Sequence, residues 1–87
     1  MQKGYNSDIQ VRDKTYHVQT EDWGHQNPFL VTRIFLNGAV LKTVKVTYAD
    51  ALRGGPVNDL NAIRLALRQQ HHRILDQLVS GQLEASQ

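Results

Sequence analysis

The chain has 87 residues and a mass of 9.9 kDa, which is enough for one domain (residues 1–87) with a small hydrophobic core. It contains no cysteine, which excludes disulfide bonds, thiol catalysis and thiolate metal sites and favours a reducing compartment. Ten Lys and Arg against eight Asp and Glu give a net charge of +2, too small an excess for a typical nucleic-acid-binding protein. No segment approaches the roughly 18 apolar residues of a membrane span. The composition therefore predicts a soluble, cytoplasmic domain.

Residues 8–12 and 15–21 predict the first two strands, because apolar and polar residues alternate along both segments. A two-residue turn at Asp13-Lys14 would place Val11 opposite Tyr16, so that the apolar side chains of both strands share one face. The other face of the second strand would be polar. We therefore expect a β-hairpin here.

Residues 29–36 and 39–48 predict a second hairpin around Asn37-Gly38, since Asn-Gly between apolar runs suits the positive φ angles of a type I′ turn. Counting outward from that turn places Arg33 opposite Lys42, a pair of like charges that is unfavourable unless an anion or a carboxylate lies near. Large apolar side chains would then point to both faces of the hairpin. One face is expected to hold Phe29, Val31, Phe35, Val40, Val44 and Val46, and the other Leu30, Ile34, Leu36, Leu41 and Lys45.

Residues 58–80 predict one long helix, with Asn58 as its N-cap and Gly81 as its C-terminal cap. Its buried stripe is expected to be Leu60, Ile63, Leu67, His71, Ile74 and Leu78. Such a helix would be about 35 Å long, whereas strands of seven or eight residues span about 25 Å. We therefore expect the end of the helix, with Leu75 and Val79, to extend past the sheet and to need a partner.

These elements define an α+β fold, in which a four-stranded antiparallel β-meander is followed by one long C-terminal α-helix. One helix can cover only one face of the third and fourth strands, so the other apolar face would stay exposed. Self-association as a homodimer or a higher oligomer would cover it.

The string Tyr16-His17-Val18-Gln19-Thr20-Glu21-Asp22 resembles a strand motif in a family of small uncharacterised bacterial proteins. The similarity extends over nearly the whole chain, with matching features at Gly4-Tyr5-Asn6-Ser7-Asp8-Ile9, at Asn27-Pro28, at Gln70-His71 and at the Leu-x-x-Gly ending that closes on Gly81. The resemblance implies a fold unit of this length without an accessory domain. It implies no activity that can be assigned to particular residues.

Candidate interaction residues lie on the second hairpin, the preceding loop and the helix. Trp23, the only tryptophan, is expected to cap the core or to contact a second copy of the chain. Arg33 and Lys42 are expected either to meet Glu21 or Asp22 or to bind an anion or an acidic partner. The full set of expected interaction residues is Trp23, Phe29, Val31, Arg33, Phe35, Lys42, His71, Leu75 and Val79.

We expect no catalytic residue, no cofactor and no metal site. His17 and Glu21 share a strand face and could form an acid–base pair, or a metal site with His25, but residues four apart on a strand lie about 13 Å apart. A polar ladder in which His17, Gln19 and Glu21 form hydrogen bonds across strands is the favoured interpretation.

The sequence favours a non-catalytic protein-interaction or assembly module that binds itself and an unidentified protein partner. The alternative is a weak nucleic-acid-binding protein that uses a basic helix face made of Arg53, Arg64, Arg68 and Arg73. The predicted helix has no aromatic residue on which bases could stack, which favours the first interpretation.

Overall fold

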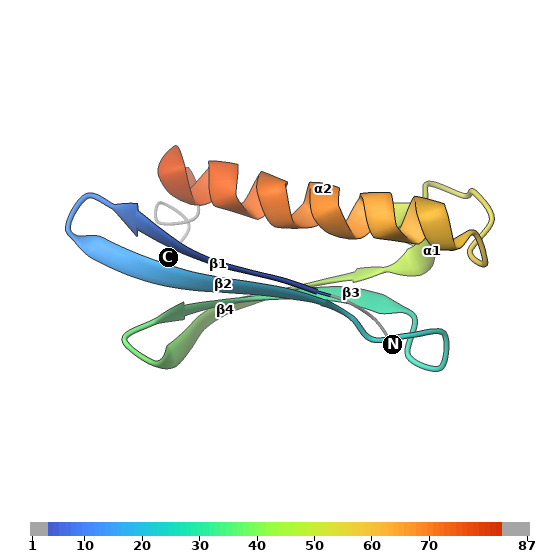
Figure 1. Cartoon of the computed structure of the whole chain (residues 1–87), viewed down its shortest axis with the longest axis horizontal. Coiled ribbons are helices and arrows are strands. Elements are labelled where there is room, and N and C mark those ends of the chain that lie inside the picture. The colour runs from blue at the N-terminus through green and yellow to red at the C-terminus, as the bar shows by residue number, and fades with distance from the viewer. Residues whose placement is uncertain (1–3, 83–87) are drawn as a thin grey trace.

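The structure is a computed structural model that describes residues 4–82 of the predicted 1–87 domain, and it has one sheet with one long helix against it (Figure 1). The strands are antiparallel and follow chain order across the sheet. The predicted α+β class is thereby confirmed. The elements are β1 (Gly4–Val11), β2 (Lys14–Asp22), β3 (Phe29–Leu36), β4 (Ala39–Thr47), α1 (Tyr48–Ala51) and α2 (Leu60–Val79).

The first hairpin turns one residue earlier than expected, at Arg12 and Asp13 rather than at Asp13-Lys14. Val11 therefore pairs with Lys14, and not with Tyr16, while Arg12 takes a positive φ of 57°. The residue of β2 opposite Val11 is therefore two positions earlier than expected. Both registers keep the same apolar side chains on one face, so the alternation could not distinguish them.

The second hairpin has the predicted tight turn, with φ of 56° at Asn37 and 81° at Gly38. Its register is wrong beyond the second pair, because a β-bulge lies next to Ile34 and Phe35 and leaves Leu41 without a partner. Ile34 pairs with Lys42, and Arg33 pairs with Thr43. The expected Arg33–Lys42 pair is therefore absent.

The bulge also exchanges the two faces of β4. Val44 and Val46 pair with Thr32 and Leu30 and so face the helix, whereas Lys45 pairs with Val31 and faces away from it. The uncovered side of the sheet is therefore less apolar than the sequence predicted.

Helix α2 begins one residue later than predicted, because Asp59 rather than Asn58 is its N-cap. The Asp59 carboxylate accepts hydrogen bonds from the backbone N–H groups of Asn61 and Ala62. The predicted stripe is otherwise confirmed, with Ile63, Leu67, His71, Ile74 and Leu78 all buried. Leu60 is exposed, since it is the first residue of the helix.

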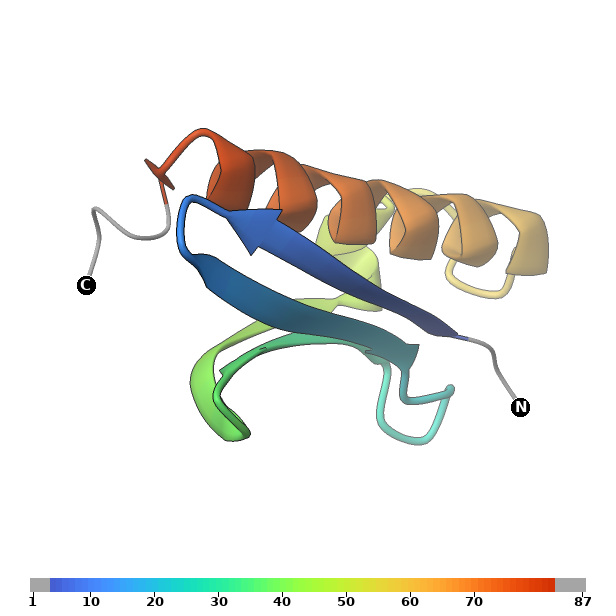
Figure 2. The same ribbon diagram turned by 60° about the vertical axis from the view of Figure 1, so that its left-hand side comes forward.

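The expected overhang of the helix beyond the sheet is wrong. Its 20 residues rise about 30 Å, and its C-terminal half lies along the β1–β2 hairpin (Figure 2). Leu75 packs against the core cluster that contains Val11, and Gly81 lies close to the guanidinium group of Arg12. Of the two residues expected beyond the sheet, Leu75 is half-buried and Val79 points away from the domain, with 58% of its surface exposed.

The core consists of two hydrophobic clusters under α2. One contains Val11, Tyr16, Val18, Ile34, Ile74 and Leu78, and the other contains Leu30, Tyr48, Ile63 and Leu67. No helix within residues 4–82 is long and apolar enough to cross a membrane.

Candidate interaction surface

One face of the sheet has no element over it within residues 4–82, and we call it the open face (Figures 1 and 2). The register and the alternation of strand side chains define its members. They include Asn6, Asp8, Gln10, Thr15, His17, Gln19, Glu21, Phe29, Val31, Arg33, Phe35, Val40, Thr43, Lys45 and Thr47, together with Trp23 from the loop after β2.

Trp23 reaches the open face because the loop from 23 to 28 is held at both ends. The backbone N–H of Trp23 donates to the carbonyl oxygen of Phe29, and the next residue, Gly24, has a φ of 89°. The carboxylate of Asp22 accepts from the Gly24 N–H and from the hydroxyl of Tyr48 on α1. Burial and the contact with Asp22 raise the pKa of Tyr48, so its hydroxyl stays protonated as a donor.

The indole of Trp23 forms the centre of a cluster of aromatic and charged groups. Its Nε1 donates to Glu21 at 3.3 Å, and its ring meets the Phe29 ring edge to face at 6.4 Å. The Arg33 guanidinium lies 5.7 Å and the Lys45 ammonium 5.1 Å from the ring centroid, both within the range of cation–π attraction. Trp23 keeps 37% of its surface exposed in this cluster.

The opposite end of the open face carries a shallow hollow of about 510 Å³, lined by Asp8, Thr15, His17, Gln19, Phe35, Asn37 and Gly38. Nδ1 of His17 lies 2.8 Å from the Asp8 carboxylate on the neighbouring strand, and the His17 ring packs near that of Phe35. Farther along β2, Gln19 donates to Glu21. Of the polar ladder expected along β2, the His17 contact crosses to another strand, whereas Gln19 and Glu21 are hydrogen-bonded to each other on the same strand.

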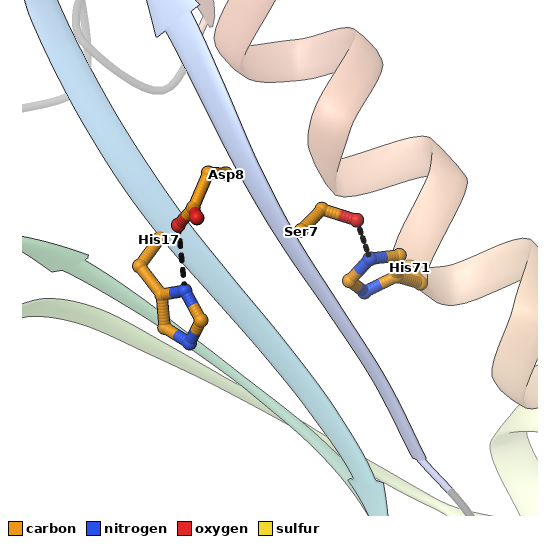
Figure 3. A network of polar contacts seen from close by, with 4 residues as sticks. All are labelled: Ser7, Asp8, His17 and His71. Atoms are coloured by element: carbon orange, nitrogen blue, oxygen red, sulfur yellow. Dashed lines mark hydrogen bonds and ion pairs between the residues drawn. The ribbon is translucent and has the colours of Figure 1, made fainter.

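Beneath the helix lies a second polar cluster, which is buried. His71 is hydrogen-bonded through Nε2 to Ser7 at 2.8 Å and through Nδ1 to Thr20 at 2.7 Å; Figure 3 draws the Ser7 contact. Thr20 is in turn hydrogen-bonded to Thr32, which also accepts from the Gln70 side-chain amide. This network ties α2 to β1, β2 and β3. It also joins Thr20 of the seven-residue string to the Gln70-His71 pair, two of the features on which the resemblance rests.

Neither histidine cluster has the parts of a catalytic site. Ser7 and His71 resemble a nucleophile and its base, but the group that orients His71 is the neutral hydroxyl of Thr20, which cannot stabilise an imidazolium ion as a carboxylate does. His17 contacts Asp8 and not Glu21, so the expected acid–base alternative lacks its second member. Among residues 4–82, no three His, Asp or Glu side chains are grouped to hold a metal ion.

The structure brings some of the expected interaction residues together and separates the others. Trp23, Phe29, Val31, Arg33 and Phe35 share the open face, where Val31 is almost fully covered. Lys42 lies on the helix side of the edge strand β4, since it pairs with Ile34. His71 and Leu75 pack inside the domain, and Val79 is exposed on the outer side of α2, away from the open face.

Sequence reasoning did not select Lys45 and Glu21 as interaction residues. Both pair with Val31, on opposite sides of it, and both contact Trp23. Lys45 had been assigned to the opposite face because a bulge leaves no signal in a strand of this composition. Glu21 is expected from the sequence only as a partner of His17 and Gln19 or of Arg33 and Lys42, and not as a contact of Trp23.

The four arginines of the expected basic face do not lie together. A helix turns about 100° per residue, so Arg64 and Arg73, nine positions apart, lie on opposite sides of α2. Arg64 contacts Asn61 on its own helix, whereas Arg73 faces Arg53 and α1.

Comparisons of the chain with protein-family models, with curated proteins and with solved structures found no match.

Proposed function

We propose that this protein is a non-catalytic, cytoplasmic interaction module that self-associates through the open face of its sheet. One observation carries the proposal: within residues 4–82 the single long helix covers one side of the sheet and leaves Trp23, Phe29, Phe35 and Val40 uncovered on the other. Aromatic residues and Arg are enriched in protein interfaces, and Trp and Arg lead among their energetic hot spots.

The two unlike ends of the open face favour a second copy of the chain as the occupant. One end carries Lys45 and Trp23, and the other carries Asp8 and the hollow beside Phe35. A twofold axis in the plane of the sheet, perpendicular to the strands, would exchange these two ends. Such an axis keeps each strand opposite the same strand of the partner, so each Trp23, which follows β2, would face the partner's hollow beside His17 and Phe35.

The β4 edge of the sheet is less suited to pairing with another chain. Strand β4 is exposed and carries a bulge at Leu41 with lysines at positions 42 and 45, and charged side chains and bulges both protect edge strands. The face of the sheet, rather than an edge, is therefore the surface we assign to assembly.

Sedimentation velocity across a concentration series tests the proposal. We expect the unaltered chain to form a dimer in the micromolar range, and Phe35→Glu and Val40→Glu to weaken it at least about tenfold, since each places a charge in a surface that must lose water. A folded monomer at several hundred micromolar would refute the proposal.

Leu65→Glu is the matched control. Leu65 and Val40 are each 52% exposed, but Leu65 lies on the outer side of α2. We expect Leu65→Glu to leave the dimer unchanged, and circular dichroism should show that all three variants remain folded. Equal weakening by Leu65→Glu and Val40→Glu would assign assembly to another surface.

The alternative of nucleic-acid binding by a basic helix face has less support, because Arg64 and Arg73 lie on opposite sides of α2. Its test is binding to random-sequence DNA over a salt series, where contacts to phosphates would give a steep salt dependence.

A further inference from the structure

A small polar hollow lies between α1 and α2, on the helix side of the sheet and away from the open face. It has a volume of about 190 Å³, and its lining includes Arg53 and Arg73, with Gln69 beside them. Arg53 follows α1 and Arg73 lies in the second half of α2, so two separate elements bring the two arginines to the lining of one hollow.

Within residues 4–82, the positive charge in this hollow is neutralised only in part. Neither Arg53 nor Arg73 forms an ion pair or a side-chain hydrogen bond among residues 4–82. Asp50 also lines the hollow, but its carboxylate makes no ion pair with either arginine within this range. Two guanidinium charges against one carboxylate leave a net charge of +1.

The walls of the hollow are well fixed. Gln70 is buried, and its side-chain amide donates to the carbonyl oxygen of Leu30 and to Thr32. The turn that carries Arg53 is closed by hydrogen bonds from Arg53 N–H to Asp50 and from Gly54 N–H to Ala49. A ligand would therefore meet prearranged backbone on both sides.

We propose that Arg53 and Arg73 form a binding site for a small phosphate-bearing molecule. A guanidinium group offers a planar fork of N–H donors that matches phosphate oxygens, and the net charge of +1 in the hollow attracts a phosphate monoester, which carries about −1.5 to −2 at pH 7. The side-chain amide of Gln69 is the third donor. The site is independent of the surface assigned to self-association.

Nuclear magnetic resonance titration of the ¹⁵N-labelled protein with inorganic phosphate tests this site, with sodium chloride and sodium acetate at matched ionic strength as comparisons. We expect phosphate to shift resonances of Arg53, Gln69 and Arg73, and to bind more tightly than acetate. Shifts spread over the surface, or acetate that binds as tightly as phosphate, would overturn the proposal.

Variants separate the site from general surface charge. Arg73→Gln and Arg53→Gly should each weaken phosphate binding at least about tenfold, and Arg68→Gln, a loss of the same charge elsewhere on α2, should leave it unchanged. Arg53 has a φ of 53°, which glycine adopts without strain, so Arg53→Gly should keep or raise the melting temperature while it loses phosphate. Equal phosphate affinity in Arg68→Gln and Arg73→Gln would overturn the proposal.

Discussion

Single residues with left-handed backbone set the turns of this fold. Gly38 has a φ of 81° at the tip of the second hairpin, and Asn37 before it also has a positive φ. A Cβ atom at Gly38 would meet no atom within 4 Å, so a side chain has room there. The requirement for glycine is therefore one of backbone conformation alone.

Replacement of Gly38 separates conformation from packing. Gly38→Val should lower the free energy of unfolding by about 1–2 kcal/mol, because a β-branched residue is disfavoured at positive φ. Gly38→Asn should cost less, since Asn tolerates the left-handed region. Urea denaturation measures both. Equal stability of Gly38→Val and the unaltered chain would contradict the type I′ turn.

At the level of elements, helix α2 stabilises the fold along its whole length. Its first half packs on the cluster with Leu30 and Tyr48, and its second half packs on the cluster with Val11 and Ile74. The two halves are joined to the sheet by the polar network around His71, which is fully hydrogen-bonded through Ser7 and Thr20. Buried polar groups satisfied in this way fix the register of a helix on a sheet better than apolar contacts alone.

Two positions near the end of α2 test where the helix lies. Leu75→Ala should lower the free energy of unfolding by about 1–3 kcal/mol, since Leu75 is half-buried against the core. Val79→Ala should change stability by less than about 0.5 kcal/mol, because Val79 is exposed. Thermal unfolding of both variants provides the measurement. Similar costs at the two positions would mean that the helix end does not pack on the β1–β2 hairpin.

At the scale of the whole molecule, the buried network should make stability depend on pH. Burial lowers the pKa of His71 below its usual value, and the neighbouring His72 adds to the effect. The groups that face His71 from the sheet are the neutral side chains of Ser7, Thr20 and Tyr5, so no carboxylate compensates a positive charge there. The folded state therefore binds fewer protons at this residue than the unfolded state does.

The sign of the effect follows from that difference. Stability due to His71 should be complete above about pH 6.5, the pKa of unfolded histidine, and should fall as the pH drops toward the lower folded value. The free energy of unfolding should change by no more than about 1.4 kcal/mol per pH unit because of this one group. Urea denaturation between pH 8 and pH 5 measures it. The His71→Gln variant should lose this part of the pH dependence. If its stability falls with pH as steeply as that of the unaltered chain, groups other than His71 cause the dependence.

The sequence by itself determined the elements and much of the open face. Alternation gave the strands, Asn37-Gly38 gave the second turn, and the helical spacing gave the buried stripe that includes His71. Phe29, Arg33 and Phe35 share a face for the same reason, because side chains two apart on a strand point the same way. These properties depend on residues close together in the chain.

Only the tertiary structure decided which residues meet across the chain. The bulge at Leu41 moved Lys45 to the open face, and the loop held by Tyr48 placed Trp23 over the same face. The pairing of Thr20 with His71 likewise joins a strand and a helix 51 residues apart. Two strand registers that differ by two residues place the same side chains on each face of the sheet. A bulge leaves the alternation of apolar and polar residues intact before and after the extra residue, so the pattern does not show where the bulge lies. The choice among them rests on packing between distant segments, which a local pattern does not contain.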